Sequence, residues 1–152
     1  MRRLKFEKLW LLSLRENRAR EEKFDASVTC VVADNDFGKS SLVKSLYATL
    51  GADPTRVPDA WKNAKIISLL RFVVDESQYF MLRQDGFCAL FDSEQELIWT
   101  ANSVVSELAP KIGEMLDFEV YLKQRGNKSA LPPPAFCFLP FYIDQDHGWA
   151  EA

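Results

Sequence analysis

The feature that most constrains this chain is a short apolar stretch followed by a turn-rich loop and an amphipathic segment. Residues 27–32 are β-branched and apolar almost without a break, which is typical of a buried strand. Turn formers fill residues 33–38, and apolar residues then recur at helical spacing over residues 39–50. Gly51 is well placed to end that helix. The sequence therefore predicts a strand, a tight loop and a helix in direct succession.

The loop between this strand and helix carries most of a phosphate-binding pattern. In the pattern GxxxxGK[ST], Gly38, Lys39 and Ser40 take the last three positions, and Ala33 stands where the first glycine is expected. Consecutive backbone N–H groups of such a loop turn inward around an anion, and the positive end of the following helix points at the same place. We therefore expect the loop from Ala33 to Ser41 to bind the phosphates of a nucleotide.

Each residue type in this loop has a distinct expected role. Gly38 permits close approach of the backbone, Lys39 reaches the β- and γ-phosphates, and the Ser40 hydroxyl helps to coordinate Mg2+. Ser41 follows, next to the α-phosphate. The alternative is an ordinary strand-to-helix turn in which Ser40 or Asp36 caps the helix. The order of strand, loop and helix favours the phosphate site.

The segments around the loop predict further elements of the N-terminal part. Alternating apolar residues over residues 3–13 predict a strand, and the charged residues 15–23 predict a connection or hairpin. Two prolines within residues 52–63 predict a loop. Residues 1–51 are thus expected to form two strands, the phosphate loop and its helix.

The middle of the chain predicts a small antiparallel β subdomain over residues 64–100. The Asp85-Gly86 pair favours a tight hairpin, because both residue types tolerate the positive φ that such turns require. Strand-like stretches stand on both sides of this pair, and a further apolar stretch follows them. These stretches are residues 66–74, 79–84, 87–91 and 97–99.

The C-terminal part predicts one helix and one strand. Apolar residues at helical spacing predict a helix over residues 104–122, although Pro110 and Gly113 favour a broken or delayed start. A polar, proline-ended linker covers residues 123–134. Residues 135–149 then form an apolar strand that ends in a polar loop.

Composition limits the classes of function. The chain has 47% hydrophobic and 27% charged residues and a net charge of -3, so no overall positive field is available to hold a polyanion. It shows no apolar run of signal-peptide or membrane-spanning length, and we expect a cytoplasmic protein without membrane contact. Cys30, Cys88 and Cys137 lie far apart, and we expect buried thiols in place of a metal or redox motif.

The loop residues Asn35, Asp36 and Phe37 extend the pattern toward one protein class. With the five residues that follow, they resemble the N-G-x-G-K-S-T/S-L loop of the SMC, RecF and RecN class of ATPases, which are ABC-type P-loop ATPases of the AAA family. The order of the predicted elements is similar to the N-terminal lobe of such an ATPase head. The resemblance implies an α/β P-loop NTPase fold with a mixed sheet, and ATP and Mg2+ as ligands.

The end of the chain resembles the Q-loop of this class. Residues 141–145 are similar to its strand and glutamine, which implies that Gln145 contacts Mg2+ and the attacking water. Gln145 and Lys39 are then the two catalytic candidates. A solvated turn is the alternative for Gln145. The neighbouring acidic and histidine side chains are expected at the surface, since three neighbours on one loop rarely converge on a metal ion. They are Asp144, Asp146 and His147.

The resemblance also extends to residues 16–20, which are similar to the surface near the adenine and the α-phosphate. This similarity makes Arg15 and Arg18 candidates for nucleotide contacts. Two acidic side chains of the loop, Asp34 and Asp36, would repel phosphate unless they turn outward, and their role stays open.

The later motifs of the family have no counterpart in the sequence. No LSGGQ-like signature occurs, and no strand ending in paired Asp-Glu follows the Q-loop. The resemblance therefore implies a single ATP-binding lobe over residues 1–152, ending just after the Q-loop and inactive alone. Hydrolysis would require a C-terminal lobe and a second ATPase head.

The implied biological roles are DNA repair, chromosome maintenance and anti-phage defence, and DNA itself enters by analogy only. A non-catalytic interaction module derived from a truncated ATPase head is the main alternative. A small P-loop kinase ranks last, because residues 66–99 predict antiparallel strands.

Overall fold

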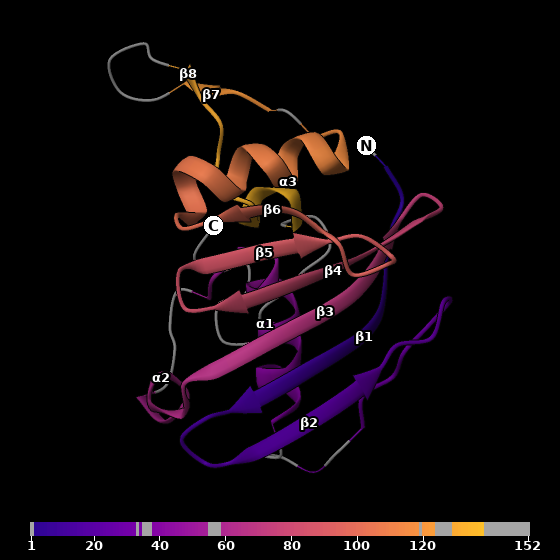
Figure 1. The fold of residues 1–152 in the computed structure, drawn as a ribbon, viewed down its shortest axis with the longest axis vertical. Coiled ribbons are helices and arrows are strands. Elements are labelled where there is room, and N and C mark those ends of the chain that lie inside the picture. The colour runs from indigo at the N-terminus through magenta and orange to yellow at the C-terminus, as the bar shows by residue number, and fades with distance from the viewer. Residues whose placement is uncertain are drawn as a thin grey trace.

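A six-stranded antiparallel sheet is the main feature of the fold, and the chain is mixed α/β with few helices (Figure 1). The computed structural model describes residues 2–32, 34, 38–54, 59–118, 120–123 and 129–138. The sheet has the strand order β2-β1-β3-β4-β5-β6. Its strands are β1 (Leu4–Ser13), β2 (Arg18–Lys23), β3 (Ile66–Val74), β4 (Ser77–Gln84), β5 (Phe87–Phe91) and β6 (Leu97–Ala101).

Short helices and one small hairpin complete the described chain. The helices are α1 (Lys39–Thr49), α2 (Asp59–Ala64), the π-helical segment η1 (Val104–Leu108), α3 (Ala109–Leu116) and α4 (Ala135–Phe138). The hairpin pairs β7 (Leu122–Lys123) with β8 (Ser129–Ala130). Side chains of α1, α3 and α4 pack against one face of the sheet, which we call the core face.

Helix α1 is held on the core face by one apolar stripe. Leu42, Leu46 and Leu50 recur every four residues, are almost fully buried, and belong to the same cluster as Leu70 of β3 and Met81 of β4. Burying each leucine side chain contributes about 1.5–3 kcal/mol. This stripe fixes the direction of α1 and therefore the position of its N-terminal end.

Residues 27–32 contradict the predicted buried strand. They form no strand, and Val28 and Val32 are 77% and 85% exposed. The Asp25 carboxylate accepts hydrogen bonds from the backbone N–H groups of Ser27 and Val28, at 2.8 and 3.4 Å, and these bonds lower the pKa of Asp25. Such local bonds compete with strand pairing. The predicted mixed sheet is therefore wrong for the described residues, whose six-stranded sheet is antiparallel.

The predicted antiparallel strands are confirmed, with small changes at their ends. For residues 15–23, where a connection and a hairpin were the alternatives, β1 and β2 form a hairpin, and β3 to β6 follow in the expected order. Asp85 adopts φ 51 in the turn between β4 and β5. The division of the chain into a lobe and a β subdomain stays a prediction.

The C-terminal part differs more from the prediction. The helix expected over residues 104–122 begins as η1, continues as α3 with Pro110 in its first turn, and ends at Leu116. Proline cannot donate a hydrogen bond to the preceding turn, which explains the irregular start. The strand expected over residues 135–149 is wrong at its beginning, where α4 lies, and residues 139–152 lie outside the described residues.

The cysteine prediction is confirmed for two of three thiols. Cys88 and Cys137 are buried, whereas Cys30 is exposed. Burial raises the pKa of both buried thiols, so at pH 8 they stay protonated to a greater extent than an exposed thiol.

We predict that a disulfide reagent at pH 8 modifies Cys30 first. Cys88 and Cys137 should react at least about tenfold more slowly, because burial removes both access and thiolate. The release of thionitrobenzoate from Ellman's reagent measures this directly. The variant Cys30→Ser should lack the fast phase, and a fast phase that survives this substitution would contradict the assignment.

We also predict that Gly51→Ala lowers the free energy of unfolding by about 1–3 kcal/mol. Gly51 adopts φ 89, and an added Cβ would lie 2.6 Å from Leu108 Cδ2 and 3.0 Å from Pro134 Cγ. Urea denaturation gives the value. Gly86→Ala is the matched control, because Gly86 has no positive φ and its added Cβ would make only an ordinary contact at 3.5 Å. Equal stabilities of the two variants would contradict the prediction.

Candidate functional site

The candidate site begins at Gly38, the residue immediately before α1. Gly38 adopts the left-handed conformation, with φ 79 and ψ 17, and an added Cβ would meet nothing within 4 Å. The requirement for glycine is therefore conformational and not steric. The first turn of α1 receives no side-chain cap hydrogen bond. Backbone N–H groups at such a helix end, together with the helix dipole, favour an anion.

Three predicted loop side chains lie on the first turn of α1. Lys39 is half-buried, and its Nζ donates a hydrogen bond to the Asp34 backbone oxygen at 2.7 Å. Ser40 and Ser41 are exposed. The lysine side chain thus reaches back along the loop, toward the chain segment that leads into it. The other predicted loop residues lie outside the described residues. They are Ala33, Asn35, Asp36 and Phe37.

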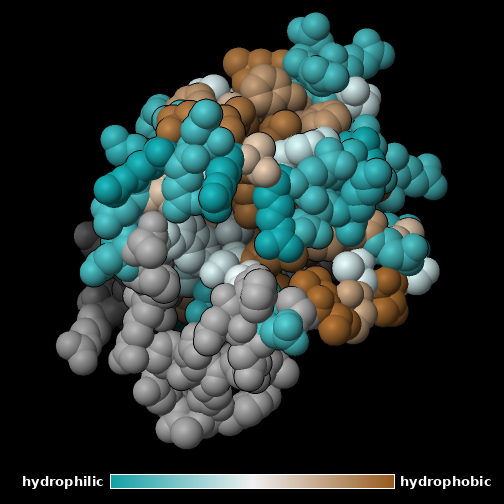
Figure 2. All heavy atoms as spheres, turned by 90° about the horizontal axis from the view of Figure 1, so that it is seen from below, coloured by the Kyte–Doolittle hydropathy of each residue, from teal (hydrophilic) through white to brown (hydrophobic). Residues whose placement is uncertain are grey.

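A cavity of about 640 Å³ lies between the start of α1 and the β1–β2 hairpin. It brings Gly38 and Ser41 together with Arg18 of β2. The view from below, toward the β2 side of the sheet, shows a mainly hydrophilic surface with hydrophobic patches in between (Figure 2). The remaining lining residues are Leu11, Ser13, Glu16, Ala19, Arg20, Leu42, Ser45, Trp61, Ala64 and Ile66.

Some of the predicted nucleotide contacts line this cavity and others do not. Arg18 lines it, whereas Lys39, Ser40 and Arg15 are not among its lining residues. Gln145 lies outside the described residues. The cavity therefore joins the hairpin arginine to the glycine and one serine of the loop.

The sequence interpretation missed Trp61 and gave Arg20 no role of its own, although Arg20 lies within residues 16–20, which were predicted near the nucleotide. Trp61 belongs to α2, within the stretch predicted as a loop, and Arg20 belongs to β2. Arg20 also forms an ion pair with Glu22, with Nη2 and Oε1 2.5 Å apart. A single tryptophan shortly after Pro54 and Pro58 was the available signal for Trp61, since aromatic side chains often line ligand cavities.

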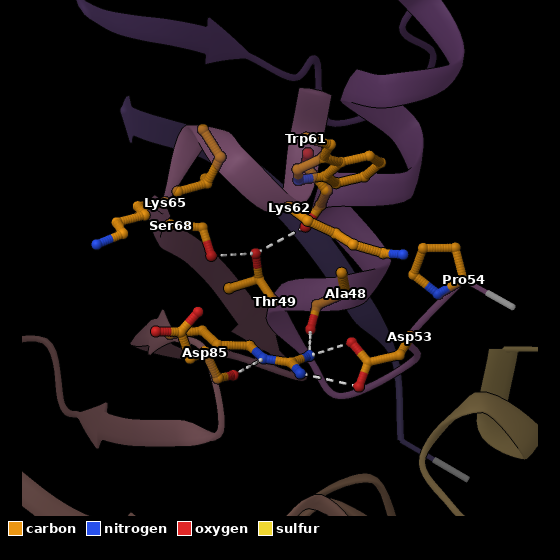
Figure 3. Close-up of a pocket in the computed structure, with 12 residues that line it drawn as sticks. Ala48, Thr49, Asp53, Pro54, Trp61, Lys62, Lys65, Ser68 and Asp85 are labelled. Atoms are coloured by element: carbon orange, nitrogen blue, oxygen red, sulfur yellow. Dashed lines mark hydrogen bonds and ion pairs between the residues drawn. The ribbon is translucent and has the colours of Figure 1, made fainter. Parts of the chain in front are cut away.

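A second, smaller cavity of about 180 Å³ lies at the opposite end of α1 and is filled with internal contacts (Figure 3). Arg83 donates to the backbone oxygens of Ala48 and Asp85 and forms an ion pair with Asp53 at 2.8 Å. Thr49 Oγ1 donates to Ser45 O at 2.7 Å and bonds to Ser68 Oγ at 2.8 Å. These groups already satisfy one another, so this cavity has a structural role.

The described residues show neither a membrane-spanning helix nor a group of metal-binding side chains. No described helix is long and apolar enough to cross a membrane. The described residues contain no group of three acidic, histidine or cysteine side chains arranged to hold a metal ion. Asp144, Asp146 and His147 lie outside the described residues.

Comparison with known proteins found two curated relatives, both named Lamassu protein LmuB. The one from Bacillus cereus (strain VD014) is 31% identical over 152 residues, which cover 99% of this chain and 26% of that protein. The one from Bacillus sp. (strain NCIM 5461 / CCTCC AB 2011126 / NIO-1130) is 28% identical over 141 residues, 91% of this chain and 24% of that protein. The chain thus spans about a quarter of the length of the relatives it matches. No family model and no solved structure matches it.

We predict that Arg83→Ala lowers the free energy of unfolding by about 1–3 kcal/mol, because the Ala48 carbonyl and Asp53 lose a charged partner. Urea denaturation measures the loss. Lys123→Ala changes an exposed residue of β7 that does not line this cavity, so it is the control and should change stability by less than about 0.5 kcal/mol. If Arg83→Ala kept the stability of the unchanged protein but lost binding of Mg-ATP, the prediction would be contradicted and this cavity would have a functional role.

Proposed function

We propose that the chain binds ATP and Mg2+ through the loop that leads into α1, as the N-terminal lobe of an SMC/RecF-like ATPase head. The observation that carries the proposal is the left-handed Gly38 directly before an uncapped helix that starts with Lys39 and Ser40. This arrangement presents backbone N–H groups, a positive helix end and a lysine at one place. Phosphate oxygens are the ligand that fits this combination.

Each loop residue then makes a different contact with the nucleotide or with Mg2+. Backbone groups around Gly38 hold the phosphates, and Lys39 exchanges its bond with the Asp34 carbonyl for one with a phosphate oxygen. The exchange is favourable because a bond between two charged groups is stronger than one to a neutral carbonyl. The Ser40 hydroxyl is a ligand of Mg2+, which compensates most of the phosphate charge.

The cavity beside the loop would hold the rest of the nucleotide. Its volume of about 640 Å³ lies within the range of small-molecule sites, which is about 300–1,000 Å³. Arg18 supplies a positive charge near the α-phosphate, and Trp61 offers an aromatic surface to the base. Ser41 lines the same cavity and links it to the phosphate loop.

Hydrolysis would require polypeptide beyond this chain. The proposed partners are a C-terminal ATPase lobe and a second ATPase head, with Gln145 contacting Mg2+ and the attacking water. Support comes from the stretch before the loop, where Val28 and Val32 are 77% and 85% exposed. Exposed β-branched residues next to a ligand loop are suited to pairing with a strand from outside.

For the biological role we propose anti-phage defence. The similarity to two Lamassu proteins supports this role over DNA repair and chromosome maintenance. Contact with DNA is proposed by analogy with the SMC class alone.

A non-catalytic interaction module is the second candidate function. The same exposed valines favour it, since they would contact a partner whether or not a nucleotide is bound. The two candidates differ in one respect, because only the first requires the phosphate loop to bind a ligand.

We predict that Lys39→Ala weakens the affinity for Mg-ATP by at least about tenfold, because one phosphate loses its charged partner. Isothermal titration calorimetry on the purified chain, alone and with its proposed partner lobe, measures the change. Lys62→Ala removes an exposed lysine that does not line the 640 Å³ cavity and serves as the matched control. Equal affinities of Lys39→Ala and the unchanged protein would reject the phosphate-loop proposal and leave the interaction module.

A further inference from the structure

The face of the sheet opposite the core face is covered by no described helix. In Figure 1, α1 runs behind the sheet, and the strands β1, β3 and β4 face the viewer without a helix across them. The buried cluster draws its strand residues from the core face, such as Leu9, Leu70 and Met81. We call the opposite face the outer face.

Large apolar side chains occupy most of the outer face. The strand register places Trp10 opposite Leu69 and Leu69 opposite Leu82, so that one apolar row crosses three neighbouring strands. The row continues to Ala89 on β5. The rows beside it are also mostly apolar. Their apolar members are Leu12, Ile67, Phe80, Phe87, Phe91 and Leu97, and their polar members are Lys8, Arg71 and Gln84. Ile98 follows Leu97 in the irregular part of β6.

The sequence of β3 also indicates that the outer face is apolar. A sheet with one face in water normally alternates apolar and polar residues, whereas β3 has apolar residues on both faces and only Ser68 and Arg71 as polar members. Continuous apolarity is typical of strands that are buried on both sides. Phe87, Leu97 and Ile98 are nevertheless 40%, 57% and 48% exposed.

We propose that the outer face binds an amphipathic, acidic α-helix of a partner protein. This proposal is independent of nucleotide binding, because the outer face and the phosphate loop lie on opposite sides of the sheet. The occupant is defined by two properties of the face, its size and its charge.

The size of the apolar region fits a helix better than a second copy of the chain. It extends over four strand spacings and about six residues along β3, or roughly 19 by 20 Å, which is a flat area of about 400 Å². A stable interface between two proteins buries about 800 Å² on each side. A helix of about 14 residues is about 21 Å long and about 10 Å wide, so it would lie along the central row within this region.

The charge at one end of the face fits acidic side chains. A depression of about 540 Å³ lies there, lined by Lys5, Lys8, Lys23 and Arg71 together with Glu7. Two acidic groups compensate part of this charge. Arg71 Nε lies 2.8 Å from Glu7 Oε2, and Lys8 Nζ lies 3.2 Å from Glu21 Oε1. Four basic against two acidic groups leave an excess of positive charge, which carboxylates at one end of the helix would neutralise.

Site-specific photo-cross-linking in the cells that naturally make the protein tests this proposal. The substitutions Leu82→p-benzoylphenylalanine and Phe87→p-benzoylphenylalanine place the reactive group on two strands of the outer face. Both should cross-link to the same partner peptide, with apolar residues at positions i, i+3, i+4 and i+7 and carboxylates near one end. Val105→p-benzoylphenylalanine is the matched control, because Val105 is 61% exposed but belongs to η1, and it should not capture this peptide.

A charge reversal completes the test. The double variant Lys5→Glu and Lys23→Glu should lower the cross-linking yield at Phe87 by about tenfold, whereas Lys123→Glu on β7 should leave the yield unchanged. Equal melting temperatures of the variants show that the sheet is intact. Cross-links to another copy of this chain, to its own polypeptide, to lipid or to nucleic acid would overturn the proposal. The absence of any cross-link at both positions would also overturn it, and so would a cross-linking yield that is the same with and without the charge reversal.

Discussion

The packing of the α1 leucine stripe on the core face is the interaction on which the rest of the structure depends. Leu42, Leu46 and Leu50 bury one side of the helix against β3 and β4. This contact sets the direction of α1, and the direction brings Gly38 to the β1–β2 hairpin. The other end of α1 is fixed by the Arg83 bond to the Ala48 carbonyl and by the left-handed Gly51. The candidate nucleotide site is thus positioned from both ends of one helix.

The two faces of the sheet have different consequences for function. The core face holds α1, the helix that follows the proposed phosphate loop. The outer face carries an apolar surface that no described element covers, and Val28 and Val32 add a second exposed apolar stretch beside the loop. The chain also spans about a quarter of the length of its Lamassu relatives. Two separate exposed apolar surfaces are thus available for contacts with other polypeptides.

The elements that local sequence specifies were predictable. Gly51 was predicted to end a helix and Asp85 to lie in a turn, and both residues adopt the positive φ that these positions favour. Alternation of apolar and polar residues predicted β1, and a strand-like apolar stretch predicted β3, each to within one residue. Residues 27–32 were not predictable from their β-branched composition, because Asp25 binds the backbone of Ser27 and Val28 and no described strand offers a partner. Long-range contacts also decided the candidate site, where Trp61 meets the hairpin only after α2 folds against β1.

We propose that backbone N–H groups at the start of α1 bind the phosphates of a nucleotide. Titration of the 15N-labelled chain with Mg-ATP, followed by amide resonances in solution, tests it most directly. The largest shifts should fall on the amides of Gly38, Lys39 and Ser40, and adenosine without phosphates should leave these amides unchanged. Shifts centred on the smaller cavity around Ala48 and Asp53, or equal shifts with adenosine, would contradict phosphate binding at the start of α1.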